Sequence, residues 1–274
     1  MSKSKFDSDG FQIISSKRSS KKSTKLPPQQ TNFVKEEIHI DVEKTYRRIL
    51  SAIEDLKTSE YLSDVNKAVS NNLKQRKVVE IVCFGLGHIG ECTISQYQLG
   101  LLLCLKDILK PDKVFVHDPI FYVNECQVLK KFGLEIIEQN QEGSYIISDQ
   151  EITLVYLPHC PKQLANNFLW SNWGLRLENC VLMCNSFTSL IENHPNRILA
   201  ETVPYIYRIF PHTTEIALEN NFTFRDIFND TSLHIFEKHK LDLLSYEFWI
   251  KNAKPNYENT EEFITSLMVE KLNL

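Results

Sequence analysis

The order of apolar runs between residues 78 and 184 constrains the fold more than any other feature of this 274-residue chain. Short runs rich in β-branched residues alternate there with longer segments of helical periodicity. The expected strands are residues 78–84, 114–117, 134–137, 153–157 and 181–184, and the expected helices are residues 89–109, 122–132 and 161–170. This alternation predicts α/β architecture: a Rossmann-like, mostly parallel sheet with helices on both faces.

The flanking segments are read from the same periodicity. Apolar residues recur at helical spacing on both sides of a break near Ser59: Tyr46, Ile49, Leu50, Ile53 and Leu56 before it, then Leu62, Val65, Val69 and Leu73. The pattern is weaker after Asn185, where we expect a helix over residues 197–209 and strands over 214–218 and 231–236. Asn259 and Glu262 resemble a capping box and predict a final helix over residues 260–272.

Three segments follow from these patterns. Residues 1–35 are expected to be a disordered basic tail, residues 36–75 a helical extension, and residues 76–274 one Rossmann-like α/β domain with a C-terminal helix. The tail carries seven basic residues against two aspartates within residues 1–30, a net charge of +5 that leaves −9 for the rest of the chain. A nuclear import signal in the run SSKRSSKKSTK is the alternative interpretation of that tail.

Composition excludes several classes of protein. The acidic body argues against direct nucleic-acid binding, which requires basic residues on the folded surface. No apolar run reaches the roughly 18 residues of a membrane span, and no apolar leader begins the chain. The seven cysteines form no CxxC pair, and three of them lie in apolar runs. We therefore expect a soluble protein in the cytoplasm, with the nucleus as a second location, and no membrane partner.

The strongest candidate for a binding site is the loop after the first expected strand, FGLGHIGE at residues 84–91. Gly85, Gly87 and Gly90 have the GxGxxG spacing of a dinucleotide-binding loop, with His88 inside it. In that motif the first glycine permits a tight turn, the second admits a phosphate, and the third allows close helix packing. Asp118 ends the second strand, where a Rossmann fold places its ribose-binding acid.

Other features of the loop argue against a phosphate. Glu91 is expected in the first turn of the helix, where its carboxylate competes with a pyrophosphate for the positive end of the helix dipole. No lysine or arginine lies in the loop to offset that charge. The interval from Gly90 to Asp118 also exceeds the usual spacing of about 20 residues. These features favour S-adenosylmethionine or another nucleoside without phosphates over a dinucleotide.

Further polar residues follow the later strands. His159 and Cys160 lie between two prolines after the fourth strand, and Asn185 with Ser186 follows the fifth. Asp230 and His234 bracket the start of the last expected strand. The candidates for proton transfer are His88, His159, Asp230 and His234, with Cys160 as a candidate nucleophile. Turn formation and core packing are the structural alternatives. No ligand pair has the spacing of a zinc site, so no metal site is predicted.

Five segments in this order resemble one known family. They are FGLGHIGE, VFVHDPIF, VYLPHCP, SNWGLRLENCVLMCNSF and FNDTSLHIF, which span about residues 78–236. Together they resemble the SRR-like family, named for plant sensitivity to red light reduced, and the length and basic tail are similar to its fungal members associated with benomyl resistance. The family pattern falls here on Gly85, Gly87, His88, Gly90, Asp118, Pro119, Pro158, His159, Cys160, Asn172, Trp173, Asn185, Ser186, Asp230, Thr231 and His234.

The resemblance implies an intracellular regulatory protein with protein partners. It links the chain to microtubule-related processes, to heme biosynthesis and to transcriptional or circadian-type regulation, and it brings no settled catalytic activity. The candidate cofactor-binding residues are then Gly85, Gly87, His88, Gly90, Asp118, Asn185 and Ser186. The alternative is an enzyme that uses a nucleotide or S-adenosylmethionine in the same crevice. For a pure binding module, Tyr205, Tyr207 and Phe210 are the candidates for an exposed patch.

Overall fold

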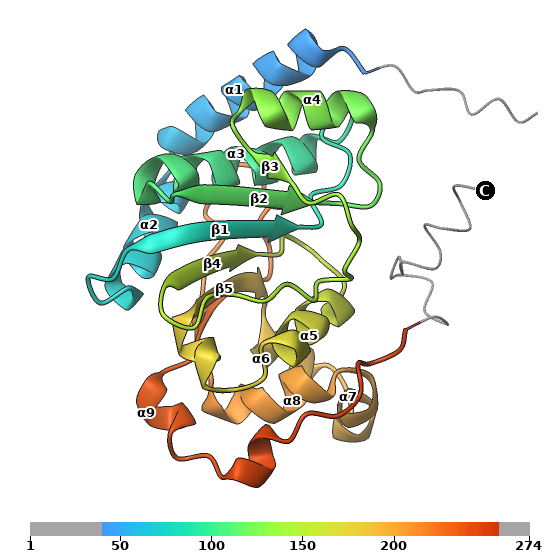
Figure 1. The fold of residues 1–274 in the computed structure, drawn as a ribbon. Coiled ribbons are helices and arrows are strands. Elements are labelled where there is room, and N and C mark those ends of the chain that lie inside the picture. Colours follow the sequence, from blue (N-terminus) through green and yellow to red (C-terminus); the bar gives the residue numbers. More distant parts are fainter. Residues whose placement is uncertain (1–39, 258–274) are drawn as a thin grey trace, which may run out of the picture. The chain divides into compact units, whose positions relative to one another are not determined.

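The structure, a computed structural model, describes residues 40–257. The expected tail at residues 1–35 and the expected helix at residues 260–272 lie outside this range. The described residues belong to one compact unit. Figure 1 shows a twisted sheet with helices on both of its faces.

A seven-stranded sheet in the order β3-β2-β1-β4-β5-β7-β6 forms the centre of the unit. The strands are β1 (Val78–Phe84), β2 (Lys113–His117), β3 (Glu135–Ile136), β4 (Ile152–Tyr156), β5 (Cys180–Asn185), β6 (Thr214–Ala217) and β7 (Thr231–Ile235). The first five strands are parallel, and β7 runs antiparallel to both β5 and β6. The α/β class and the mostly parallel sheet predicted from the alternation of apolar runs are confirmed.

The helices divide between the two faces. The longer ones are α1 (Val42–Lys57), α2 (Glu60–Asn72), α3 (Thr93–Leu109), α4 (Val123–Lys131) and α5 (Lys162–Ser171). The shorter ones are α6 (Phe187–Glu192), α7 (Asn196–Thr202), α8 (Pro204–Ile209), α9 (Lys238–Leu241) and the 3-10 turns η1 (Leu175–Asn179), η2 (Phe210–His212) and η3 (Tyr246–Trp249). Side chains of β1 alternate between the faces: Ile81 and Cys83 join the core under α1 to α4, and Val82 and Phe84 join the core under α5 to α8.

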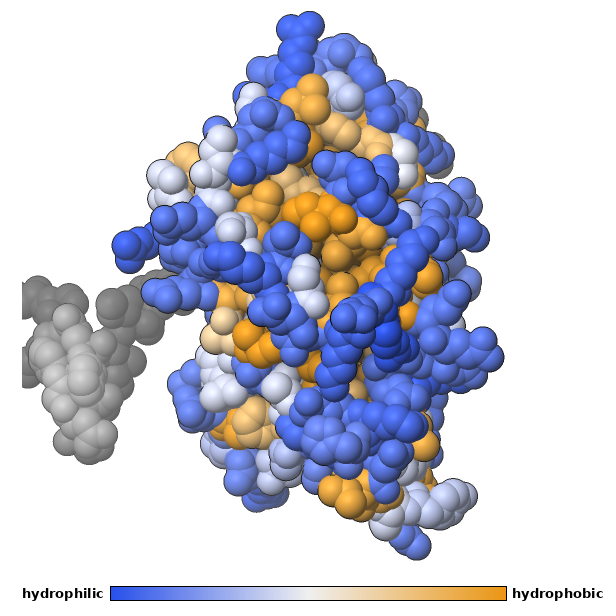
Figure 2. Space-filling model, turned by 90° about the vertical axis from the view of Figure 1, so that its left-hand side faces the viewer, coloured by the Kyte–Doolittle hydropathy of each residue, from blue (hydrophilic) through white to orange (hydrophobic). Residues whose placement is uncertain are grey.

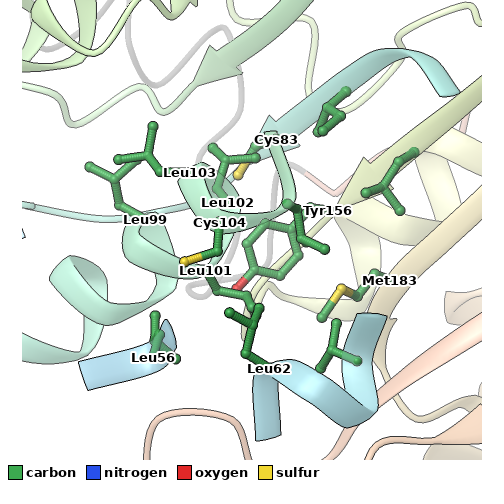
Figure 3. Packing of buried hydrophobic residues seen from close by; sticks show 14 of the residues in the cluster. Leu56, Leu62, Cys83, Leu99, Leu101, Leu102, Leu103, Cys104, Tyr156 and Met183 are labelled. Atoms are coloured by element: carbon green, nitrogen blue, oxygen red, sulfur yellow. The ribbon is translucent and has the colours of Figure 1, made fainter. Parts of the chain in front are cut away.

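The N-terminal helices are part of the core rather than a separate layer. The two helices start at side-chain caps, because Asp41 accepts the N–H of Lys44 and Ser59 accepts the N–H of Leu62. A Cβ atom at Gly100 of α3 would lie 3.1 Å from Leu56, so the glycine allows α1 to cross α3 closely. In Figure 3, Leu56 and Leu62 from α1 and α2 lie in the same cluster as Tyr156 of β4. Removing the extension would therefore expose the α3 side of the sheet.

One expected element differs from the structure. The helix expected at residues 197–209 is two helices, α7 and α8, because Pro204 starts a new helix and Val203 before it leaves the helical conformation. Residues 140–149 form a loop without strands. None of the helices among residues 40–257 is both long and apolar enough to cross a membrane.

The carboxyl ends of the parallel strands lie on the right-hand side of Figure 1. Figure 2 shows the opposite side, where β1 begins; apolar residues gather near its middle among a mostly hydrophilic surface. Chain order reverses across β1, whose neighbours are β2 and β4. Ligands of open α/β sheets bind at such a reversal, beyond the carboxyl ends of the strands.

Candidate functional site

A cavity of about 220 Å³ lies at the reversal point, and we call it the glycine crevice. It is bounded by the ends of β1 and β2, by the segment after β4 and by the start of α5. Its lining residues are Phe84, Gly85, Gly87, His117, Asp118, Pro119, Ile120, Asn140, His159, Cys160, Pro161 and Leu164. The crevice therefore brings together five of the predicted site residues, namely Gly85, Gly87, Asp118, His159 and Cys160.

The first glycine of the loop is required by close packing. Gly85 has φ +77°, in the left-handed region, and a Cβ atom there would lie 2.3 Å from Cys160 Sγ. The Cys160 thiol donates to the carbonyl of Phe84 at 3.1 Å. Burial raises the pKa of Cys160 well above its usual value, with the charge of Asp118 acting in the same direction. The candidate nucleophile is thus a buried, protonated thiol that fixes the position of the loop.

The carboxylate of Asp118 lies against the glycine loop. Its Oδ2 accepts the backbone N–H of Gly87 at 2.7 Å, and its Oδ1 accepts the backbone N–H of Ile120 at 3.1 Å. In a dinucleotide-binding loop the corresponding amides face the pyrophosphate. Here a side chain of the protein occupies the position of the anion next to Gly87.

A second carboxylate, Glu125 of α4, occupies the other end of the loop. It is fully buried and accepts the N–H groups of Gly90 at 2.8 Å and Tyr122 at 2.9 Å. The Nδ1 atom of His88 lies 3.1 Å from the same carboxylate, and the His88 ring stacks on Tyr122 with centroids 4.1 Å apart. Glu125 was not predicted as a site residue, because nothing in its sequence neighbourhood separates it from an ordinary helical glutamate.

Two expectations about the loop are wrong. The helix expected from residue 89 begins at Thr93, with Cys92 as its N-cap, so Glu91 lies in an exposed turn and not in the first helical turn. The carboxylates that compete with phosphate are Asp118 and Glu125. Gly90 does not serve helix packing on the strand either, since a Cβ atom there would lie 2.4 Å from Ile40, the residue that precedes Asp41 and α1.

Two histidines line the crevice, and they differ in how many of their ring nitrogens have a hydrogen-bond partner. The Nε2 atom of His159 lies 3.0 Å from the carbonyl of Asn229, and its Nδ1 atom lies 3.2 Å from Nε2 of Gln98. Both ring nitrogens are therefore engaged. The Nδ1 atom of His117 lies 2.6 Å from the carbonyl of Ile137 and donates to it, so Nε2 is the nitrogen that acts as an acceptor when the ring is neutral. Nε2 of His117 is buried and has no partner within the described part of the chain.

A second cavity, of about 170 Å³, lies on the other side of the Cys160–Pro161 segment, and we call it the β4–β5 cavity. Its lining residues are Leu157, Cys160, Pro161, Lys162, Ala165, Cys184, Asn185, Ser186, Phe187, Ser189, Leu190, Asn193, His194, Ile206 and Asp230. The structure thus places Asn185, Ser186 and Asp230 here and separates them from the glycine loop. Asp230 has φ +55°, and its carbonyl accepts the N–H of Ser186 at 2.8 Å.

His234 lies in the sheet, beside this cavity and not in it. It is fully buried and pairs across the antiparallel ladder with Glu215, whose Oε2 lies 3.7 Å from His234 Nε2. Burial lowers the pKa of His234 to about 4, and the charge of Glu215 opposes this. Nε2 accepts the N–H of Phe187 at 3.3 Å. His234 is therefore a neutral histidine that holds the start of α6.

Glu215 is a further residue that the sequence analysis missed. Its two oxygens accept hydrogen bonds from the hydroxyl of Ser186 at 2.5 Å and from the N–H and hydroxyl of Thr188 at 2.8 and 2.7 Å. Burial raises the pKa of Glu215, but the hydrogen bonds from Ser186 and Thr188 act in the opposite direction, and the pKa is lowered overall. The hydroxyl group of Ser186 therefore already has two structural roles: it caps the N-terminus of α6 and donates a hydrogen bond to Glu215.

Other motif residues have structural contacts. Asn172 is buried and holds the 140–151 loop, since its Oδ1 accepts the N–H of Ile147 and its Nδ2 donates to the carbonyl of Tyr145. Tyr205 of the proposed aromatic patch is buried, and Tyr207 and Phe210 are half-buried. No group of three or more histidine, cysteine or acidic side chains among residues 40–257 is arranged to hold a metal ion.

Comparison with known proteins identifies relatives of this chain by sequence. The family model of the SRR1 domain matches residues 49–235. An SRR1-like protein of Drosophila melanogaster is 33% identical over 230 residues, which is 82% of this chain and 80% of the relative. An SRR1-like protein of Mus musculus is 30% identical over 62% of this chain and 82% of the relative. The Arabidopsis thaliana protein SENSITIVITY TO RED LIGHT REDUCED 1 is 24% identical over 77% of each chain.

The fold and crevice define a Rossmann-like α/β protein whose glycine loop binds side chains of the protein itself. The SRR1 family model matches more than half of the chain, so the chain belongs to the SRR1 domain family. No solved structure matches it.

Proposed function

We propose that the protein is an intracellular regulator whose glycine crevice binds a small ligand without phosphate groups, and that partner proteins respond to the occupied form. Membership of the SRR1 family supports a regulatory role. The observation that carries the ligand class is the hydrogen bond from Gly87 N–H to Asp118. A phosphate at this amide would have to displace a carboxylate of the same charge and then remain beside it.

The remaining hydrogen-bonding capacity of the crevice favours a ligand that donates. An ionised carboxylate has about four lone-pair positions, and Asp118 uses two of them for Gly87 and Ile120. In its neutral form, His117 adds an acceptor at Nε2, which has no partner among residues 40–257. Hydroxyl, amino or ammonium groups satisfy such acceptors. A nucleoside supplies the hydroxyl groups, and S-adenosylmethionine supplies hydroxyl groups together with positive charge.

The cellular role follows the family. We place the protein in the cytoplasm, with the nucleus as a second location, and in microtubule-related processes, heme biosynthesis or transcriptional regulation of the circadian type. The similarity to fungal members associated with benomyl resistance remains a prediction. A strain that lacks the gene is complemented with the wild type, Asp118→Asn, or the exposed control Asp112→Asn. Growth on benomyl and heme content are then compared, and full complementation by Asp118→Asn would contradict a role for the crevice.

The ligand class is tested by thermal unfolding of the purified full-length protein. The panel contains adenosine, S-adenosylmethionine, NAD(H), NADP(H), flavins and heme. A ligand at about 100 times its dissociation constant adds about 2.7 kcal/mol, or a few degrees in the midpoint. We expect a shift with adenosine or S-adenosylmethionine that Asp118→Asn abolishes and Asp112→Asn retains. Equal or larger shifts with the dinucleotides, or no shift with any compound, would overturn the proposal.

A further inference from the structure

The lining of the β4–β5 cavity combines apolar and polar side chains. Leu157 at the end of β4, Ala165 of α5, Phe187 of α6 and Ile206 of α8 contribute apolar side chains. Lys162, Asn185 and Asp230 are among the polar residues of the lining. Its volume of about 170 Å³ is below the roughly 300–1,000 Å³ of pockets for drug-sized ligands. The occupant must therefore be a small molecule with one apolar and one polar end.

The residues that line the cavity include a cation, Lys162, and an anion, Asp230, which do not form an ion pair with each other. Lys162 is at the first position of α5, and Asp230 lies just before β7. Neither residue forms an ion pair within residues 40–257, although both line the same cavity. Burial raises the pKa of Asp230, while a hydrogen bond from Ser189 and the charge of His159 lower it. The Asp230 side chain is exposed to solvent and has no ion-pair partner among the described residues, so an incoming ammonium group would gain a favourable charge interaction with it.

Asn185 adds a third polar group that lacks a partner. Its Nδ2 donates to the carbonyl of Cys160 at 3.3 Å, which fixes the amide at the end of β5. Its Oδ1 is buried and accepts no hydrogen bond from the described residues. A buried acceptor that stays unsatisfied costs about 1–3 kcal/mol. A ligand N–H group at this position would remove that cost.

We propose that the β4–β5 cavity binds a free α-amino acid with an apolar side chain. The side chain packs against Leu157, Phe187 and Ile206. The ammonium group donates to Asp230 and to Oδ1 of Asn185, and the carboxylate pairs with Lys162. The proposal uses no residue that contacts the glycine loop's amides, so it stands independently of the ligand in the glycine crevice.

The test is isothermal titration of the full-length protein with L-leucine, L-methionine and L-phenylalanine. Two analogues of leucine separate the charges: leucinamide lacks the carboxylate, and 4-methylpentanoate lacks the ammonium group. We expect at least one amino acid to bind, and each analogue to bind about tenfold or more weakly than leucine, a difference of about 1.4 kcal/mol. No binding at about 10 mM, or an analogue that binds as well as leucine, would overturn the proposal.

Charge variants locate the site. Lys162→Met and Asp230→Asn should each weaken binding by about tenfold. Asparagine tolerates the left-handed backbone at position 230, so this variant is expected to fold. The exposed controls Lys67→Met and Asp149→Asn should leave the affinity unchanged. If both charge variants bind with wild-type affinity, the amino acid binds elsewhere and the proposal is overturned. If a variant fails to fold, the comparison of leucine with its two analogues provides the test.

Discussion

The backbone N–H of Gly87 donates a 2.7 Å hydrogen bond to Oδ2 of Asp118, across the end of the β1–β2 pair. Both residues are in the order expected for a nucleotide-binding loop, but they bind each other. The loop therefore keeps its glycine geometry while its own carboxylates occupy the positions near the amides. This contact separates the protein from a dinucleotide-binding Rossmann fold more sharply than any difference in strand order.

Glu125 should be the strongest single link between the glycine loop and α4. Glu125→Ala leaves the N–H groups of Gly90 and Tyr122 without their acceptor, and each such buried donor costs about 1–3 kcal/mol. We expect the free energy of unfolding to fall by about 3 kcal/mol in urea denaturation. Glu138→Gln, at an exposed position, is the control. A loss below about 1 kcal/mol would mean that the loop stands without this carboxylate.

The clash between a side chain at position 85 and Cys160 can be measured by a double-mutant cycle. Gly85→Ala adds a strained left-handed backbone, worth about 1 kcal/mol, and an overlap with Cys160 Sγ worth about 1–3 kcal/mol. In a Cys160→Ala background only the backbone strain remains. Urea denaturation of the four proteins should show that the glycine substitution costs about 2 kcal/mol less in that background. The same cost in both backgrounds would refute the contact.

His234 makes stability depend on pH in a defined direction. Its pKa is lowered from 6.5 to about 4 in the folded protein, mainly by burial, so the unfolded chain binds a proton that the folded protein refuses. Its contribution is therefore present above about pH 6.5 and is lost as the pH falls toward 4. At 1.36 kcal/mol per pKa unit the loss is about 3 kcal/mol.

The variant His234→Gln keeps a donor and an acceptor but does not titrate. Its free energy of unfolding should change less between pH 6.5 and pH 4 than that of the wild type. The exposed control His239→Gln should follow the wild type. Because the pKa of Glu215 is lowered in the folded protein, all three proteins also lose free energy of unfolding when Glu215 is protonated at low pH. Parallel curves for wild type and His234→Gln would assign the dependence to other groups.

Arg208 of α8 should hold the segment at residues 246–252, which includes η3, against α8 and the residues after α5. Its guanidinium group stacks on Trp173 and Phe248, 4.9 and 5.1 Å from the ring centroids, and donates to the carbonyl of Phe248. Arg208→Lys keeps the charge and loses the planar stacking, so we expect about 1–2 kcal/mol of destabilisation.

Tryptophan fluorescence reports on Arg208 directly, because all three tryptophans of the chain contact this segment or belong to it. The emission of Arg208→Lys should shift to longer wavelength, since Trp173 and Trp249 gain exposure to water. The exposed control Arg197→Lys should leave the spectrum unchanged. An unchanged spectrum in Arg208→Lys would show that the aromatic contacts hold the segment without the guanidinium group.

The sheet was predictable because its strands carry an uninterrupted apolar signal. The runs around Val82 and Val155 contribute to the core on both faces, and no other arrangement covers them. The division of residues 197–209 was also visible in principle, since Pro204 starts a new helix. Antiparallel insertion of β7 between β5 and β6 was not predictable, because it depends on pairings such as Glu215 with His234 that no local pattern encodes.

The sequence analysis placed the candidate residues in one crevice, whereas the structure divides them between two cavities. Gly87 and Asp118 were expected near each other and are in contact, whereas Asn185 and Asp230 lie in a different cavity. Glu125 was missed because the partners that make it special are backbone amides distant in sequence. Long-range hydrogen bonds of a buried carboxylate leave no trace in spacing or composition.

The most direct test of the central claim is isothermal titration of the wild-type protein with adenosine and with AMP, which differ only in a phosphate. The carboxylate of Asp118 beside the Gly87 amide predicts that adenosine binds and that AMP binds about tenfold or more weakly. Asp118→Asn should remove the preference for adenosine, because it loses both the carboxylate that adenosine binds and the charge that repels the phosphate of AMP. Tighter binding of AMP than of adenosine to the wild type would contradict the account, since the loop would then act as a phosphate site in spite of its carboxylates.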